Sequence, residues 1–171
     1  FAAGEDFESY PRDFQADQQA LKAAGGVDAI YAPPVMYRDQ HATHIVPSGV
    51  ALPMEGESRP HFFTGVATVV CKLFQHVPAD YAIFGEKDFQ QLAVLRQMVA
   101  DLNLSVTLIA HPTIRESDGL ALSSRNHYLS AEQRAIAPLL YQTLSKSAAE
   151  ILAGSDILQS LEKAKRQLLA G

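Results

Sequence analysis

Several features that would assign a chain of 171 residues to a particular class are missing from this sequence. It has no tryptophan and a single cysteine, Cys71, so an internal disulfide is excluded, and an unpaired thiol fits a reducing cytoplasm better than a secreted setting. No apolar run approaches the length of a membrane-spanning helix, and the N-terminus lacks the charged-then-apolar pattern of a signal peptide. We therefore expect a cytoplasmic protein that has no membrane partner.

Basic clusters and common catalytic signatures are also missing. The net charge is −5, and the Lys and Arg residues are scattered, which argues against a nucleic-acid partner. There is no Walker-type loop, CxxC pair or GxSxG elbow. His41 and His44 are spaced like metal ligands, but no third ligand is apparent, so we interpret them as loop histidines.

What the chain does have is 47% apolar residues, enough for a real core, and a regular alternation of strands and helices. We predict helices over 12–26 with Pro11 in the first turn, 63–77, 86–103, 130–152 and 156–169, and strands over 27–34, 80–85 and 105–110. The segment 36–59 is irregular, with at most one or two short strands. Strand, helix and strand between 80 and 110 form a βαβ unit, so the fold class is α/β with a parallel sheet, and a helix-rich segment follows a boundary near Thr113.

Apolar residues at three- and four-residue spacing predict which helix faces are buried. The inward positions expected in the two central helices are Val66, Val69, Val70, Leu73, Phe74 and Val77 in one, and Leu92, Leu95, Met98, Val99 and Leu102 in the other.

The first candidate site is the segment "GEKDFQQ", which follows the strand at 80–85. Gly85 permits close backbone approach, a helix N-terminus favours anions, and Lys87 adds a cation, which together suit a phosphate. Asp88 is expected to cap the helix as well as to contact a ligand, although charged residues also begin many ordinary solvated helices. Gln91 lies one turn beyond Lys87 on the same side, so it is a better ligand contact than Gln90.

The second candidate site is "DGLALSSRN", which follows the strand at 105–110. The hydroxyls of Ser123 and Ser124 and the guanidinium of Arg125 are donors that suit a phosphoryl group, and Asp118-Gly119 is a candidate hinge for closing them over it. A plain linker is the alternative. Ligands bind at the carboxyl ends of parallel strands, and two donor clusters at successive strand ends favour a nucleotide site.

In combination these motifs resemble the pantothenate synthetase (pantoate–β-alanine ligase) family. The resemblance rests on "FGEKDFQQL" and "DGLALSSRN", preceded by "YPR" and "GVATVVCKLF", and runs from residue 1 to about residue 144. It implies the Rossmann-like parallel sheet of the nucleotidylyl-transferase superfamily, which carries a HIGH-type motif, with residues 1–113 as the remainder of that domain. Residues 114–171 would hold a KMSKS-like loop and part of a smaller C-terminal domain.

The resemblance also implies a reaction and its residues. Pantoate and ATP would form pantoyl adenylate and pyrophosphate with Mg²⁺, and β-alanine would then release AMP and pantothenate. The residues implied to bind ATP are Gly85, Glu86, Lys87, Asp88, Ile114, Leu122, Ser123, Ser124 and Arg125, with Lys87, Ser123, Ser124 and Arg125 catalytic. Gln91 would contact pantoate, and Asp88 is the one candidate metal ligand. A homodimer is expected from the family.

Two departures from the family pattern limit these expectations. The HIGH-type motif is absent because the chain begins at what resembles a family phenylalanine, Phe1, so we expect this chain alone to be inactive. The family's usual "RPGHFRG" is here "RPHFFTG", and we assign no role to His61, Phe62 or Thr64. The alternatives are a nucleotidyl transferase of the same superfamily with another acceptor, and an inactive nucleotide-binding module.

Overall fold

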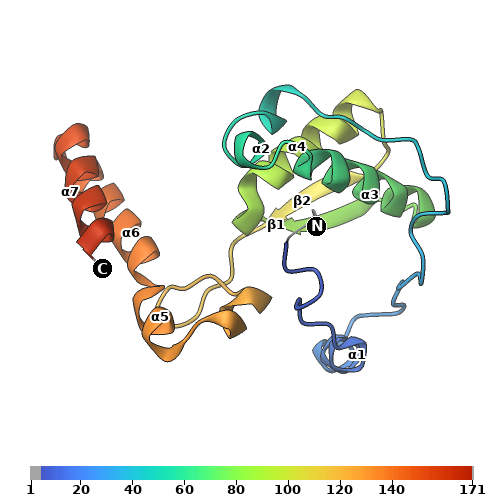
Figure 1. Cartoon of the computed structure of the whole chain (residues 1–171), viewed down its shortest axis with the longest axis horizontal. Helices are drawn as coiled ribbons and strands as arrows, with labels where there is room; N and C mark the ends of the chain where they lie inside the picture. Colours follow the sequence, from blue (N-terminus) through green and yellow to red (C-terminus); the bar gives the residue numbers. More distant parts are fainter. Residues whose placement is uncertain (1–4, 171) are drawn as a thin grey trace. The chain divides into compact units, whose positions relative to one another are not determined.

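A computed structural model describes residues 5–170 of the chain, which form two compact units joined between Pro112 and Thr113 (Figure 1). Phe1 lies outside the described residues. No helix within 5–170 combines the length and the apolar character needed to cross a membrane. Each unit is described separately below.

The centre of the first unit is the predicted βαβ arrangement (Figure 1). Strand β1 (Tyr81–Gly85) leads through the 3₁₀ turn η2 (Glu86–Asp88) into helix α4 (Phe89–Asp101), which returns the chain to β2 (Thr107–His111). The two strands are parallel, with Tyr81 opposite Thr107 and Gly85 opposite His111. The α/β class and the parallel pairing are therefore confirmed.

Helix α3 (Phe62–His76) and helix α4 form the core with one face of this strand pair. Ala67 and Val70 of α3 pack with Leu95 and Met98 of α4, and half-buried Phe84 of β1 and Leu108 of β2 pack against them. Side chains alternate along each strand, so the opposite face of the two strands is exposed in the described residues.

The helix faces differ from the predicted ones at two ends and in the middle. Val77 and Leu102 are 42% and 45% exposed, because each lies just past the last helical residue and no longer follows the inward stripe. Val94, which the pattern missed, is fully buried against Ala51 and Phe63. Helix α4 therefore buries a second face, toward the 3₁₀ turn η1 (Gly49–Ala51) and the start of α3.

Residues 5–35 contain one helix and no strand. Helix α1 (Phe14–Ala24) begins after Asp13, whose carboxylate accepts a hydrogen bond from the Ala16 N–H (2.9 Å), so Pro11 lies before the helix rather than in its first turn. The predicted strand at 27–34 is wrong. It ends in Pro33-Pro34, which have no N–H to donate, and no strand of the described chain pairs with it. The segment 36–59 holds η1 and the short helix α2 (Glu55–Ser58) but no strand.

The second unit contains the 3₁₀ turn η3 (Ser124–Tyr128) and the helices α5 (Ala131–Ile136), α6 (Leu139–Leu152) and α7 (Ile157–Ala170). Ser130 and Gln133 form the predicted capping box at α5. The single predicted helix at 130–152 is wrong, because Pro138 has no N–H for the Arg134 carbonyl and the chain restarts there as α6.

Helices α6 and α7 form a hairpin whose contact surface consists of small side chains. Thr143 and Ser147 of α6 and Ser160 and Ala164 of α7 are buried. Small residues allow two helix backbones to approach closely, and Lys163 Nζ of α7 also pairs with Glu150 Oε1 of α6 (2.6 Å).

Candidate active site

The first predicted cluster lies at the carboxyl end of β1, as expected. Gly85 ends the strand, and Glu86, Lys87 and Asp88 form the 3₁₀ turn before α4, all of them exposed. The Lys87 ammonium is 3.3 Å from Asp88 Oδ1. The Lys87 side chain is 42% exposed, so the other N–H donors of its ammonium are available to an anion.

Asp88 stands at the N-cap position of α4, but its side chain makes no capping hydrogen bond. The prediction that it caps the helix is therefore wrong. Its backbone (φ −96°, ψ 62°) differs from the extended conformation that directs a capping side chain back to the helix amides. Its carboxylate pairs with Lys87 instead.

Gly85 is not required by the chain's own packing. Its φ is −71°, an ordinary value for any residue, and a Cβ built there would have the Lys87 backbone nitrogen, at 4.0 Å, as its only neighbour within that distance. A side chain at this position would project into open space. The absence of one leaves the backbone open to a ligand.

The two glutamines of "FQQL" are used differently, and this fits the predicted distinction between them. The Gln90 carboxamide donates to the carbonyls of Val50 (3.0 Å) and Pro53 (2.7 Å) and accepts from the Glu55 N–H (3.2 Å). Gln90 is therefore occupied by the fold. Gln91 is half-buried beside it.

The second predicted cluster begins in a tight backbone hairpin of the second unit. The Leu122 N–H donates to the Ile114 carbonyl (2.9 Å), and the Glu116 N–H donates to the Leu120 carbonyl (2.8 Å). These bonds place Ile114 and Leu122 opposite each other, 54% and 47% exposed. The two apolar residues implied to contact ATP therefore lie together at the open end of the hairpin.

The serine and arginine residues follow directly as a capped turn. The Ser123 hydroxyl accepts from the Arg125 N–H (3.2 Å), and the Asn126 side-chain amide donates to the Ala121 carbonyl (3.0 Å). Ser124 and Arg125 are exposed on η3. Ser123 thus caps the turn that presents its two neighbours, which is a structural use that the sequence did not predict.

The turn Asp118-Gly119, which the sequence suggests as a hinge, makes several contacts with α5 and α6, and its role as a hinge stays a prediction. The Arg134 guanidinium of α5 donates to Asp118 Oδ2 (2.6 Å), and the Gln142 side chain of α6 donates to the Asp118 carbonyl (3.3 Å). The hydrogen bond from Arg134 is the main reason that the pKa of Asp118 is below its usual value. Gly119 has φ +95° and lies against Tyr141, whose Cδ1 would be 2.6 Å from an added Cβ.

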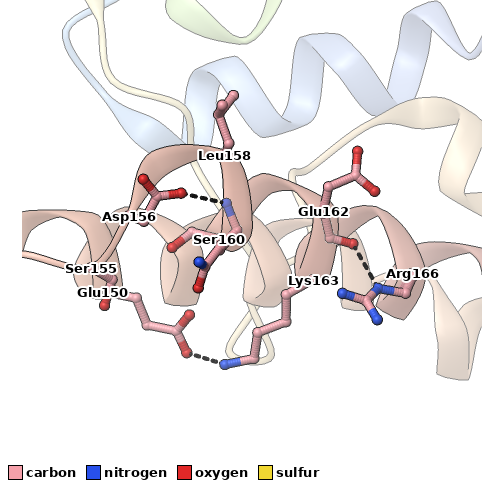
Figure 2. A pocket seen from close by; sticks show the side chains of 9 residues that line it. Glu150, Ser155, Asp156, Leu158, Ser160, Glu162, Lys163 and Arg166 are labelled. Atoms are coloured by element: carbon pink, nitrogen blue, oxygen red, sulfur yellow. Dashed lines mark hydrogen bonds and ion pairs between the residues drawn. The ribbon is translucent and has the colours of Figure 1, made fainter.

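A hollow on the second unit, between the end of α6 and α7, is separate from these residues. Figure 2 shows two contacts of its charged side chains within the hairpin: Lys163 pairs with Glu150, and Arg166 Nε donates to the Glu162 carbonyl (3.3 Å). Asp156 accepts from the Gln159 N–H (2.9 Å). No predicted site residue lines it.

The histidines and the "RPHFFTG" segment have packing roles. The rings of His41 and His44 meet edge to face with centroids 5.4 Å apart, and residues 5–170 contain no group of three metal-ligating side chains. The Arg59 guanidinium lies 3.8 Å from the centre of the Phe62 ring and pairs with Glu5 and Glu55. The phenylalanine that replaces the usual histidine is thus covered by an arginine.

Comparison with known proteins identifies the family of this chain. The sequence model described as Pantoate-beta-alanine ligase matches residues 1–170. The chain belongs to the pantoate-beta-alanine ligase family. A relative named pantothenate synthetase from Alkalilimnicola ehrlichii is 52% identical over 174 aligned residues, covering 99% of this chain and 60% of the relative. One from Pseudomonas fluorescens is 51% identical over 99% of this chain and 60% of its own length.

Solved structures of pantothenate synthetases have the same fold as this chain. That of the Thermus thermophilus protein has a TM-score of 0.94 at 46% identity, covering 99% of this chain and 62% of that protein. A Francisella tularensis pantoate-beta-alanine ligase, described as complexed with beta-gamma ATP and beta-alanine, has a TM-score of 0.77 at 34% identity, covering 95% and 61%. This member of the pantoate-beta-alanine ligase family spans about 60% of the length of the curated relatives it matches.

Proposed function

We propose that the protein containing this chain is an ATP-dependent ligase that joins pantoate and β-alanine into pantothenate. The observation that carries the proposal is the exposed Lys87 on the turn between β1 and α4, in a chain of the pantoate-beta-alanine ligase family. The relatives' names and the nucleotide and β-alanine bound to the Francisella protein support the substrates.

In the first step a pantoate carboxylate oxygen attacks the α-phosphorus of ATP. The bond from this phosphorus to the α–β bridging oxygen breaks, so pyrophosphate leaves and the pantoyl adenylate is formed. Both reactants are anionic, so the step needs cationic groups that offset the charge as it develops. Lys87 supplies one, and the bare backbone at Gly85 lets a phosphate approach the turn. In the second step the β-alanine amine attacks the acyl carbon, and AMP leaves.

The remaining contacts follow the family resemblance, and the positions of the side chains within each unit are compatible with them. Of the two neighbouring glutamines, Gln91 is the one assigned to pantoate, because the Gln90 side chain already donates to the carbonyls of Val50 and Pro53. Ser123, Ser124 and Arg125 contact the phosphates, while the exposed pair Ile114 and Leu122 gives the nucleotide an apolar contact. Glu86 and Asp88 complete the ATP site beside Lys87.

Magnesium fits this donor set through one residue. Mg²⁺ in nucleotide enzymes binds through one or two carboxylates together with substrate phosphates and waters, and Asp88 is an exposed carboxylate beside Lys87. Bound there, the ion would offset phosphate charge and orient the pyrophosphate leaving group. Asp88 alone would hold it weakly without ATP, so we propose that metal and nucleotide bind together.

The wider assignments follow the family resemblance and are part of the proposal. They are membership of the nucleotidylyl-transferase superfamily, a Rossmann-like nucleotide-binding domain for residues 1–113, a KMSKS-like loop with part of a C-terminal domain for 114–171, a homodimer, and a cytoplasmic location. Native mass spectrometry of the full-length protein tests the dimer directly.

The test of the function is pyrophosphate release by the full-length protein with ATP, Mg²⁺ and pantoate, with and without β-alanine. Pantoate-dependent release is expected, and Lys87→Ala should lower it by about a hundredfold or more, the usual cost of a lost charge-stabilising donor. Lys22→Ala, an exposed lysine in the last turn of α1, is the matched control and should have no effect. Release without pantoate would indicate another acceptor, and no release would leave an inactive nucleotide-binding module.

A further inference from the structure

Gln90 is the polar residue of the "FQQL" motif to which neither the family resemblance nor the proposed chemistry gives a role. Its carboxamide has two N–H donors and one oxygen, and all of these groups are used. They reach the carbonyls of Val50 and Pro53 and the N–H of Glu55, which are 35 to 40 residues earlier in the chain. One side chain therefore ties both ends of the segment 50–55 to the first turn of α4.

The segment that Gln90 holds is compact and has an apolar base. Ala51 packs with Phe63 and with Val94, which lies one helical turn after Gln90 on the same side of α4. Gly56 passes so close to the Ala51 carbonyl that an added Cβ would be 1.7 Å from its oxygen, so the segment turns back tightly on itself. The apolar base and the three hydrogen bonds together fix the rotation of the first turn of α4 about its own axis.

That rotation determines where the next side chain points. Successive residues of an α-helix are about 100° apart around the axis, so a first turn fixed at Gln90 also fixes the direction of Gln91. Gln91 is half-buried, and its side chain makes no hydrogen bond within residues 5–170 that would set its orientation.

We propose that Gln90 is a positioning residue for substrate: its carboxamide clasps segment 50–55 to the first turn of α4 and thereby directs the Gln91 side chain toward pantoate. The clasp itself depends only on the contacts above, while its consequence for pantoate rests on the proposed function.

The experiment uses the full-length protein and the variant Gln90→Met, which keeps the length of the side chain and removes its three hydrogen bonds. Hydrogen exchange of peptides covering 49–56 is expected to accelerate by about tenfold or more, because the Glu55 N–H and the segment that carries it lose their partner. Unchanged protection of β1 and β2 shows that the variant is folded. Gln97→Met is the matched control: it is on the same helix, and its carboxamide bonds only Asp101 (2.7 Å).

The kinetic readout separates positioning from general damage. Gln90→Met should raise the KM for pantoate by about tenfold with kcat and the KM for ATP within about twofold, whereas a merely misfolded fraction would lower kcat alone. If Gln90 acts through Gln91, the KM effect should vanish when Gln91→Ala is already present. Equal effects in both backgrounds, or an unchanged KM in the single variant, would overturn the proposal.

Two outcomes distinguish failure of the proposed ligase function from failure of the proposed role of Gln90. If the wild-type protein shows no pantoate-dependent pyrophosphate release, the proposed function fails, and unaltered exchange at 49–56 in Gln90→Met would independently refute the clasp. Should Gln90→Met not fold, Gln90→Glu answers the same question, because its carboxylate still accepts from Glu55 but faces two carbonyl oxygens to which it cannot donate.

Discussion

Gly119→Ala should destabilise the second unit by about 3 kcal/mol, and the structure gives two separate reasons. The φ of +95° is one that residues with a side chain rarely adopt, at a cost of about 1–3 kcal/mol. The added Cβ would also be 2.6 Å from Tyr141 Cδ1, so the ring or the turn must move, which costs about 1–3 kcal/mol more. Tyr141 is 41% exposed, and the Arg115 guanidinium, 3.7 Å from the centre of its ring, opposes movement of the ring.

The assay is thermal unfolding of the full-length protein followed by circular dichroism. At about 2–4 °C per kcal/mol for a domain of 150–250 residues, the melting temperature should fall by roughly 6–12 °C. Gly65→Ala is the control with the opposite sign: it lies inside α3 with no atom within 4 Å of the new Cβ, so it should stabilise by about 0.5–1 kcal/mol. A Gly119→Ala protein that melts with wild type would refute the reasoning.

Two further changes have defined outcomes. Gly85→Ala should leave the melting temperature within a degree or two, because its Cβ meets open space, yet weaken ATP binding by about tenfold if a phosphate approaches that backbone; isothermal titration with ATP and Mg²⁺ decides, and unchanged affinity contradicts the proposed contact. Asp118→Asn should be less stable than wild type at pH 7, with the difference disappearing in acid. Because the folded pKa of Asp118 is lowered by Arg134, its contribution is complete above the unfolded value near 3.8 and is lost as the pH falls through the lower folded value. Melting curves from pH 7 down to pH 2.5 check this, and a gap that does not narrow as the pH falls below 3.8 would show that the ion pair is not its source.

The parts of the fold that the sequence predicts are those encoded by neighbours along the chain. The periodicity of α3 and α4, the apolar strands β1 and β2 and the Ser130–Gln133 capping box are local patterns, and all of them are found. The places of Lys87 and Gln91 in the fold are predicted for the same reason, since both residues follow one strand end directly. Pro138 carried an equally local signal against a continuous helix from 130 to 152, and the strength of the amphipathic pattern on either side obscured it.

The errors come from partners far away in the sequence. A strand exists only where its backbone groups are paired. Pro33-Pro34 argues against pairing at the end of the segment, but residues 27–32 do not reveal whether a neighbouring strand is present. Val94 is buried by residues about 30 and 40 positions earlier, so a single inward stripe on α4 could not include it. Gln90 shares the face of Val94, four residues away, and recognising that second buried face is the one signal that would have identified its role.

The contrast between local signals and distant partners also divides the motif "DGLALSSRN" into two halves. Asp118 and Gly119 are fixed by Arg134, Gln142 and Tyr141, partners from α5 and α6 that make this turn part of the fold of the second unit. Ser124 and Arg125 are exposed on a turn capped by Ser123. A phosphate-binding loop gains affinity when its donors are held in place before the ligand arrives, since less conformational entropy is then lost on binding. Under the proposed function, the contacts of Asp118 and Gly119 with α5 and α6 would help to hold the donors of the second half in place before ATP arrives.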